Sequence, residues 1–74
     1  MTREDRYTKA TKLNVIADEY FAMAHNCVNA YLQLSKMDMP SLTKKYLELS
    51  RSYTNRGYNL RDNAFDIIEN RAKN

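Results

Sequence analysis

The stretch YFAMAHNCVNAYLQLS, residues 20–35, decides the fold of this chain, since its sixteen residues include no Asp, Glu, Lys or Arg. Its hydrophobic residues recur every three or four positions, which is the spacing of one face of a helix. A helix that faces water on most of its surface carries a charged side. We therefore expect protein to cover this helix on more than one side, as in a subunit that associates.

The same spacing continues outward in both directions and predicts two long helices. The first apolar seam comprises Leu13, Ile16, Tyr20, Ala24, Cys27, Tyr31 and Leu34, and the second comprises Leu42, Tyr46, Leu49, Tyr53, Gly57, Leu60, Ala64 and Ile67. Thr2 and Asp5 are spaced for a capping box at the start of the first helix. Pro40 disfavours a helical Met39, and Asp38 is placed to cap the next helix with its side chain.

We predict a single all-α domain over residues 1–74, with a helix at about 3–36, a turn at 37–40 and a helix at about 41–72 that pack as an antiparallel helical hairpin. The alternative is a break near Gly57 that gives a third helix in a compact monomer. The apolar spacing passes through Gly57 without a shift, which favours a continuous helix. In the hairpin, Gly57 would lie opposite Tyr20 and Phe21, where its missing side chain leaves room for a ring.

The composition argues against an enzyme. A chain of 74 residues has too little interior for a deep substrate cleft, and it contains no Gly-rich phosphate loop, paired-carboxylate metal motif or nucleophile motif. His25 and Cys27 are the single residues of their kinds, so neither a zinc motif nor an intramolecular disulfide is expected. We expect a non-enzymatic cytoplasmic protein with no catalytic residues, no cofactor, no metal site and no role at a membrane.

Large hydrophobic residues also lie beside the two seams. A lone hairpin would leave them in water, and two helices alone bury too little apolar surface to offset the entropy of the unfolded chain. We therefore predict a homo-oligomeric helical bundle, with a dimer that forms a four-helix bundle as the first choice. The predicted oligomer interface comprises Phe21, Val28, Leu32, Leu47, Tyr58, Phe65 and Ile68.

Two classes of function agree with such a protein. The first is a small regulator or inhibitor, of the kind that phages and plasmids encode, which binds an unidentified protein partner through its helical faces. In outline the chain resembles the plasmid-encoded RNA-binding helical hairpins that dimerise into four-helix bundles; this likeness is one of architecture, and no sequence motif carries it.

The second class is the binding or sequestering of a nucleotide or nucleic acid at the oligomer interface. Basic side chains would contact phosphate and tyrosines would stack on a base. The candidate contacts are Tyr7, Lys12, Arg56, Tyr58 and Arg61. The formal net charge of +3 is too small to establish nucleic-acid binding by itself.

Overall fold

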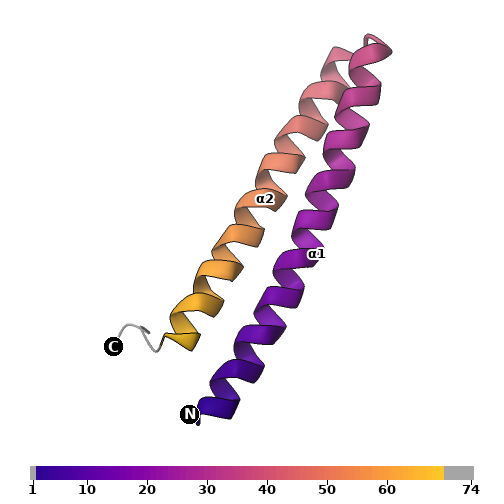
Figure 1. Cartoon of the computed structure of the whole chain (residues 1–74). Helices are drawn as coiled ribbons and strands as arrows, with labels where there is room; N and C mark the ends of the chain where they lie inside the picture. Colours follow the sequence, from indigo (N-terminus) through magenta and orange to yellow (C-terminus); the bar gives the residue numbers. More distant parts are fainter. Residues whose placement is uncertain (1, 70–74) are drawn as a thin grey trace.

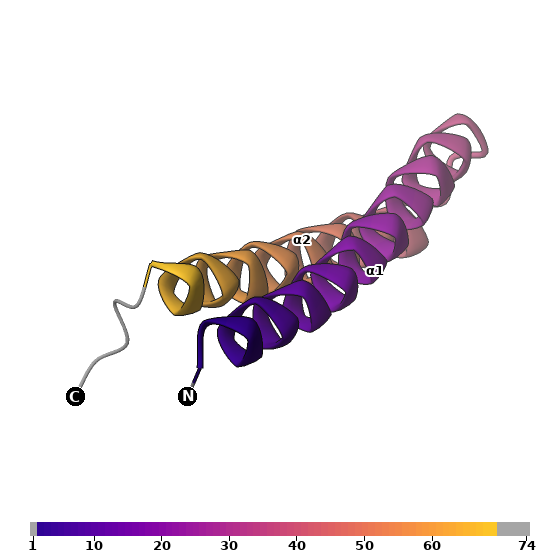
Figure 2. The same cartoon turned by 60° about the horizontal axis from the view of Figure 1, so that its bottom comes forward.

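The computed structural model describes residues 2–69, which form two long helices joined by a tight turn (Figure 1). Helix α1 spans Arg3–Lys36 and helix α2 spans Pro40–Ile68. The helices pack antiparallel, and they remain side by side when the view is turned (Figure 2). The radius of gyration is 16.4 Å, whereas a compact domain of this length has about 11 Å. The all-α hairpin predicted from the sequence is confirmed, and it is elongated.

The first turn of α1 is capped as the sequence predicts. The backbone N–H of Asp5 donates to the Thr2 hydroxyl oxygen at 3.1 Å, and the backbone N–H of Thr2 donates to the Asp5 carboxylate at 3.4 Å. These two reciprocal bonds make a capping box, which satisfies two backbone donors that a helix start otherwise leaves free. Glu4 and Asp5 also place negative charge at the positive end of the helix dipole.

The turn corrects one expectation, that the Asp38 side chain caps α2. Asp38 instead has a φ of 55°, in the left-handed region. Its backbone N–H donates to the Ser35 carbonyl and that of Met39 donates to the Leu34 carbonyl, which is the Schellman ending of a helix. Asp38 therefore helps to end α1, and Asp is among the few residues that tolerate this conformation.

Helix α2 begins with Pro40, because a proline at the first helical position gives up no helical hydrogen bond. It is continuous through Gly57, so the alternative of a break and a third helix is wrong. Ile68 is the last helical residue and Glu69 is the C-cap. The sequence predicts a helix to about residue 72, and residues 70–72 lie outside the described part of the chain.

Gly57 stays helical because the other helix fills the space beside it. A Cβ atom at this position would lie 2.7 Å from Cε1 and 2.8 Å from Cζ of Phe21. The prediction that a ring packs against Gly57 is therefore confirmed for Phe21. Tyr20 lies against Tyr53 instead, with ring centroids 6.0 Å apart.

Small residues form the buried seam between the helices. They are Ala10, Ala17, Ala24 and Cys27 on α1, and Ser50, Gly57 and Ala64 on α2. Three of them on each helix recur at intervals of seven residues, the repeat of a coiled coil. The hydroxyl of Ser50 donates to the Leu47 carbonyl at 2.7 Å, so the one polar side chain of the seam is satisfied.

Two residues assigned to the seams from the sequence do not lie in them. Ile16 is 41% exposed and Leu42 is 38% exposed, so the prediction is wrong for both. The physical reason is the size of the residues at the contact. Because small side chains set the helix–helix distance, a branched or long side chain is excluded to the flank of the contact.

Candidate functional site

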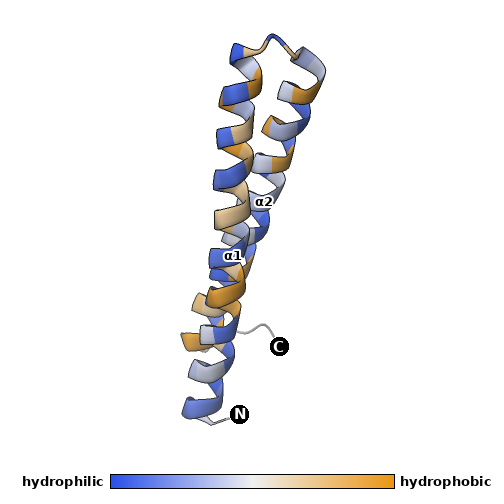
Figure 3. Cartoon of the chain, turned by 90° about the vertical axis from the view of Figure 1, so that its right-hand side faces the viewer, coloured by the Kyte–Doolittle hydropathy of each residue, from blue (hydrophilic) through white to orange (hydrophobic). Residues whose placement is uncertain are grey.

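None of the large side chains within residues 2–69 is fully buried. Tyr58 is 57% exposed, Phe65 is 50% exposed and Met37 is 65% exposed. Figure 3 shows hydrophobic residues spread along both helices and interleaved with hydrophilic ones. Since such residues are ordinarily buried, the surface itself is the candidate functional feature of this protein.

The seven-residue repeat of the seam divides the remaining apolar residues into two flanks. Each seam residue of a helix has two neighbours that flank the helix–helix contact. One is the residue four positions after it and the other is the residue one position before it, and the two lie on opposite sides of the contact. Phe21 and Val28 follow Ala17 and Ala24 by four positions, whereas Ile16 and Met23 precede them by one. The structure thus has two separate apolar faces.

The first flank is centred on the ring of Phe21. The Tyr58 ring packs edge-on against it with centroids 5.1 Å apart, and the Arg61 guanidinium lies 4.9 Å from its centroid. Val28 follows Phe21 by seven residues, and Leu47 precedes Arg61 by fourteen. Because residues at multiples of seven share one side of such a helix, Val28 and Leu47 lie on the same flank as Phe21 and Arg61. We call this surface the Phe21 face and define it by Phe21, Val28, Leu32, Leu47, Tyr58, Phe65 and Ile68. These are the seven residues that the sequence predicts for the oligomer interface.

A shallow depression lies on the Phe21 face across both helices. It has a volume of about 370 Å³, is open to solvent, and is lined by Asn14 of α1 and by Arg61, Phe65 and Ile68 of α2. Two of these side chains are apolar, and one of the polar ones is already paired. The depression can therefore receive an apolar side chain from another protein surface.

Arg61 links the two helices beside this depression. Its guanidinium Nη2 donates to Asp18 Oδ1 at 2.8 Å, and both side chains are more than half exposed. An exposed ion pair of this kind adds at most about 1 kcal/mol of stability. Its main effect is on geometry, because it keeps the guanidinium over the Phe21 ring.

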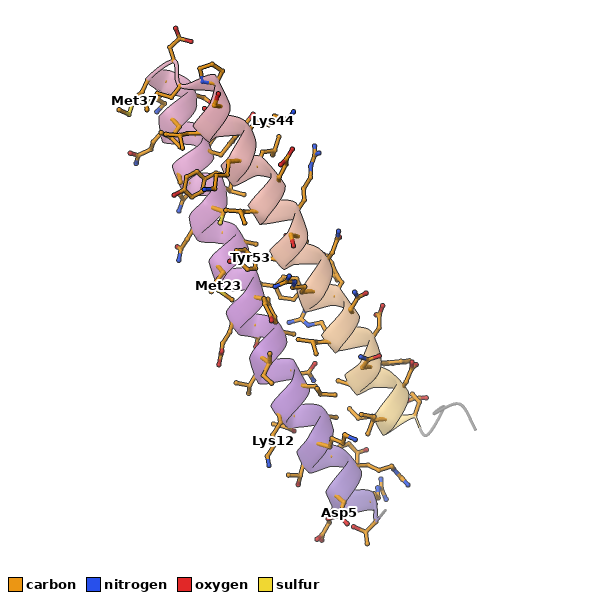
Figure 4. The ribbon with its side chains drawn as sticks, turned by 180° about the vertical axis from the view of Figure 1, so that it is seen from behind. Asp5, Lys12, Met23, Met37, Lys44 and Tyr53 are labelled. Carbon is orange, nitrogen blue, oxygen red and sulfur yellow. The ribbon has the colours of Figure 1, made fainter. Side chains whose placement is uncertain are left out.

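The structure does not gather the five candidate nucleotide contacts into one site. Tyr58 and Arg61 share the Phe21 ring, but Arg56 lies over Tyr20, 5.9 Å from its centroid. Tyr7 lies near the start of α1, where the Arg3 guanidinium is 5.9 Å from its ring centroid. Lys12 is exposed on the edge of α1 that faces away from α2 (Figure 4).

Sequence reasoning missed the part that Asp18 and Asn14 play on this face. The signal for Asp18 was present in the hairpin register. In that register Gly57 lies opposite Phe21. Arg61 follows Gly57 by four residues and Asp18 precedes Phe21 by three, so in an antiparallel pair the two residues lie near each other. Asn14 gave no comparable signal, because a single amide on a helix is most often solvated.

The second flank is formed by Ile16, Met23 and Ala30 of α1, by Met37, which is the C-cap of α1, and by Leu42 and Leu49 of α2. We call it the Met23 face. Figure 4 shows Met23 on the edge of α1 away from α2 and Met37 on the same side at the turn, whereas Tyr53 lies between the helices. Ile16, Met23, Met37 and Leu42 are exposed, and Ala30 and Leu49 are half-buried.

Residues 2–69 provide neither a metal site nor a membrane span. No group of three or more His, Cys, Asp or Glu side chains there could hold a metal ion, and Cys27 is a free thiol buried in the seam. Neither described helix contains a stretch that is apolar enough to span a bilayer. No family model, no curated protein and no solved structure matches this chain.

Proposed function

We propose that this protein is a small non-enzymatic helical protein that self-associates through its Phe21 face and acts by protein–protein contact, as a regulator or inhibitor. One observation carries the proposal: the seam between the helices buries only small residues, while large apolar side chains on the flank are half exposed. Large apolar side chains are what stable assembly interfaces bury.

The total accessible surface supports self-association. The whole chain of 74 residues exposes 5797 Å². A compact monomer of 8.7 kDa exposes about 4,700 Å², so this chain exposes about 1,100 Å² more. A standard protein–protein interface removes about 800 Å² from each partner. The excess is therefore large enough to form at least one such interface.

A symmetric pair is the simplest arrangement that covers the Phe21 face. In a two-fold dimer the same patch meets itself, so the Phe21 faces of two hairpins would enclose a common core in a four-helix bundle. The aromatic residues Phe21, Tyr58 and Phe65 would then supply most of the buried area, as aromatic residues do at the centres of interfaces.

The character of the depression on the Phe21 face supports a contact function more than a chemical one. Among the side chains of residues 2–69 that line it, Arg61 is the charged one, and one of its donors is already bonded to Asp18. The second candidate function is the binding of a nucleotide or nucleic acid. The observation that favours it is that Tyr58 and Arg61, a ring and a guanidinium, lie against the same Phe21 ring.

A pair of substitutions on the same ring separates the two functions. Tyr58→Ala should weaken self-association by roughly tenfold or more, because an aromatic residue at the centre of an interface contributes about 2 kcal/mol. Arg61→Ala should have a smaller effect, since its ion pair with Asp18 is exposed. Sedimentation equilibrium measures both association constants.

The nucleotide function predicts a different outcome for the same two variants. Both would keep the association constant of the native protein, and both would lose the 260 nm absorbance of a co-purified nucleotide. That result would replace protein contact by ligand binding as the function of this face.

A further inference from the structure

The depression on the Phe21 face lies in one half of that face, near the end of the hairpin where α1 begins and α2 ends. The residues that line this half, which we call the open half, are Asn14, Arg61, Phe65 and Ile68. The other half, the turn half, holds Val28, Leu32 and Leu47, and the first two are 40% and 50% exposed. The Tyr58 ring packs on Phe21 between the two halves. The two ends of the face therefore differ in shape.

We propose that the second copy in the self-contact lies antiparallel to the first, so that the turn half of each Phe21 face fills the depression of the other. This inference rests on the proposed function, because it states how the second copy sits on the Phe21 face. The two turns then point to opposite ends of the four-helix bundle. The two-fold axis crosses the hairpins at Phe21 and Tyr58, and each copy completes the depression of the other.

A parallel pair, with both turns at one end, covers the same face but leaves a gap in it. Its two-fold axis runs along the hairpins, so every residue keeps the level of its counterpart and one depression faces the other. Each depression has a volume of about 370 Å³. Interface cores pack as densely as protein interiors, and atoms that line unfilled space lose their contacts. The depression therefore favours the antiparallel pair.

The register of α1 agrees with this arrangement. In the antiparallel pair each helix faces its own copy, and an axis at Phe21 pairs residues that lie at equal distances before and after it. Asn14 and Val28 are each seven residues from Phe21, so Val28 of one copy lies over the depression beside Asn14 of the other. Asp18 and His25 lie three residues before and four residues after Phe21. The axis thus places a carboxylate opposite an imidazole that can donate to it.

Helix α2 has the matching register about Tyr58. Leu47 precedes Tyr58 by eleven residues and Ile68 follows it by ten, so Leu47 of one copy lies on Ile68 in the depression of the other. Arg51 and Phe65 are each seven residues from Tyr58, which places a guanidinium opposite a ring. Because Tyr58 contacts Phe21 within each hairpin, a single axis serves both helices.

Distances between spin labels, measured by double electron–electron resonance, distinguish the two arrangements. The label is attached to Lys36→Cys in a Cys27→Ala background, which removes the native thiol. Lys36 is exposed at the turn end, fifteen residues from Phe21. In the antiparallel pair the labels should be about 45 Å apart, since thirty residues of helix span this length. In a parallel pair they would lie within about 25 Å, because neighbouring helix axes are about 10 Å apart.

Ala22→Cys in the same background is the matched control, because Ala22 is exposed and adjoins the proposed axis. Its labels should lie within about 30 Å of each other in either arrangement, which establishes that the pair has formed. Thr8→Cys, at the opposite end of α1, is the second test site, and its labels should be about 40 Å apart in the antiparallel pair. Circular dichroism establishes that each labelled variant remains helical.

The expected result is a long distance at Lys36 and Thr8 together with a short distance at Ala22. Short distances at all three sites would overturn the antiparallel pair and would leave self-association through the Phe21 face standing. If no site shows coupling between two labels, self-association itself is contradicted, and the antiparallel pair with it.

Discussion

Phe65→Asp is expected to break the contact through the Phe21 face and to raise its dissociation constant at least 100-fold, which corresponds to about 3 kcal/mol. Phe65 is half exposed in the single hairpin, so the carboxylate is tolerated there. In the assembled protein the same carboxylate would be enclosed among apolar side chains and would lose its hydration. Val28→Asp should act in the same way from α1.

The measurement is the thermal unfolding midpoint, followed by circular dichroism over a hundredfold range of protein concentration. Association makes the midpoint of the native protein rise with concentration, and this dependence should weaken in both variants. Asn29→Asp is the matched control, because Asn29 is the exposed neighbour of Val28 on the side of α1 opposite α2. Equal midpoints at every concentration for the native protein and all three variants would contradict the proposed interface.

Gly57→Leu is expected to destabilise the hairpin by about 3 kcal/mol, the upper part of the range for overpacked sites. Even a Cβ atom at Gly57 would approach the Phe21 ring to 2.7 Å, and a leucine adds three further carbons. The helices would have to separate along a seam built from small residues. Urea unfolding at one fixed protein concentration measures the change.

A double-mutant cycle tests whether Phe21 is the cause. Gly57→Ala in the native background should be destabilising, because overpacking against the ring outweighs the gain in helix propensity of about 1 kcal/mol. In the Phe21→Ala background the ring is absent, so Gly57→Ala should stabilise by about 1 kcal/mol. Equal stabilisation in both backgrounds would show that the Phe21 ring moves aside without cost. It would contradict the claim that Phe21 packs closely against Gly57.

Much of the fold could be predicted from the sequence because its signals are local. The spacing of Thr2 and Asp5 predicts the capping box, and the uninterrupted apolar spacing predicts a helix through Gly57. The pairing of Gly57 with Phe21 follows once the turn is placed near Pro40. Each of these inferences depends on residue type and spacing alone.

The composition of the seam could not be predicted in the same way. Hydrophobicity alone favours Ile16 over Ala17 as the buried seam residue. In the structure Ala17 is buried and Ile16 is exposed, because two closely packed helices accommodate the smaller side chain between them. The Asp38 conformation was missed for a related reason. Its side chain suits a helix start, yet the Schellman bonds at the end of α1 place its backbone in the left-handed region.

The residues proposed for the candidate site come from the sequence, and the structure adds how they are arranged on the hairpin. The seven residues chosen for the interface share one flank because the hairpin keeps a single register over its length. The separation of Arg56 from Arg61 needed the structure, since it depends on which ring, Tyr20 or Phe21, each guanidinium lies over.

The measurement that tests the central claim most directly is the solution mass of the purified native protein by light scattering, with its absorbance at 260 nm recorded in the same run. Self-association through the Phe21 face predicts a species of two or more 8.7 kDa chains with low absorbance at 260 nm. A single chain of 8.7 kDa at every concentration would contradict self-association. An oligomer that carries strong absorbance at 260 nm would instead favour nucleotide or nucleic-acid binding.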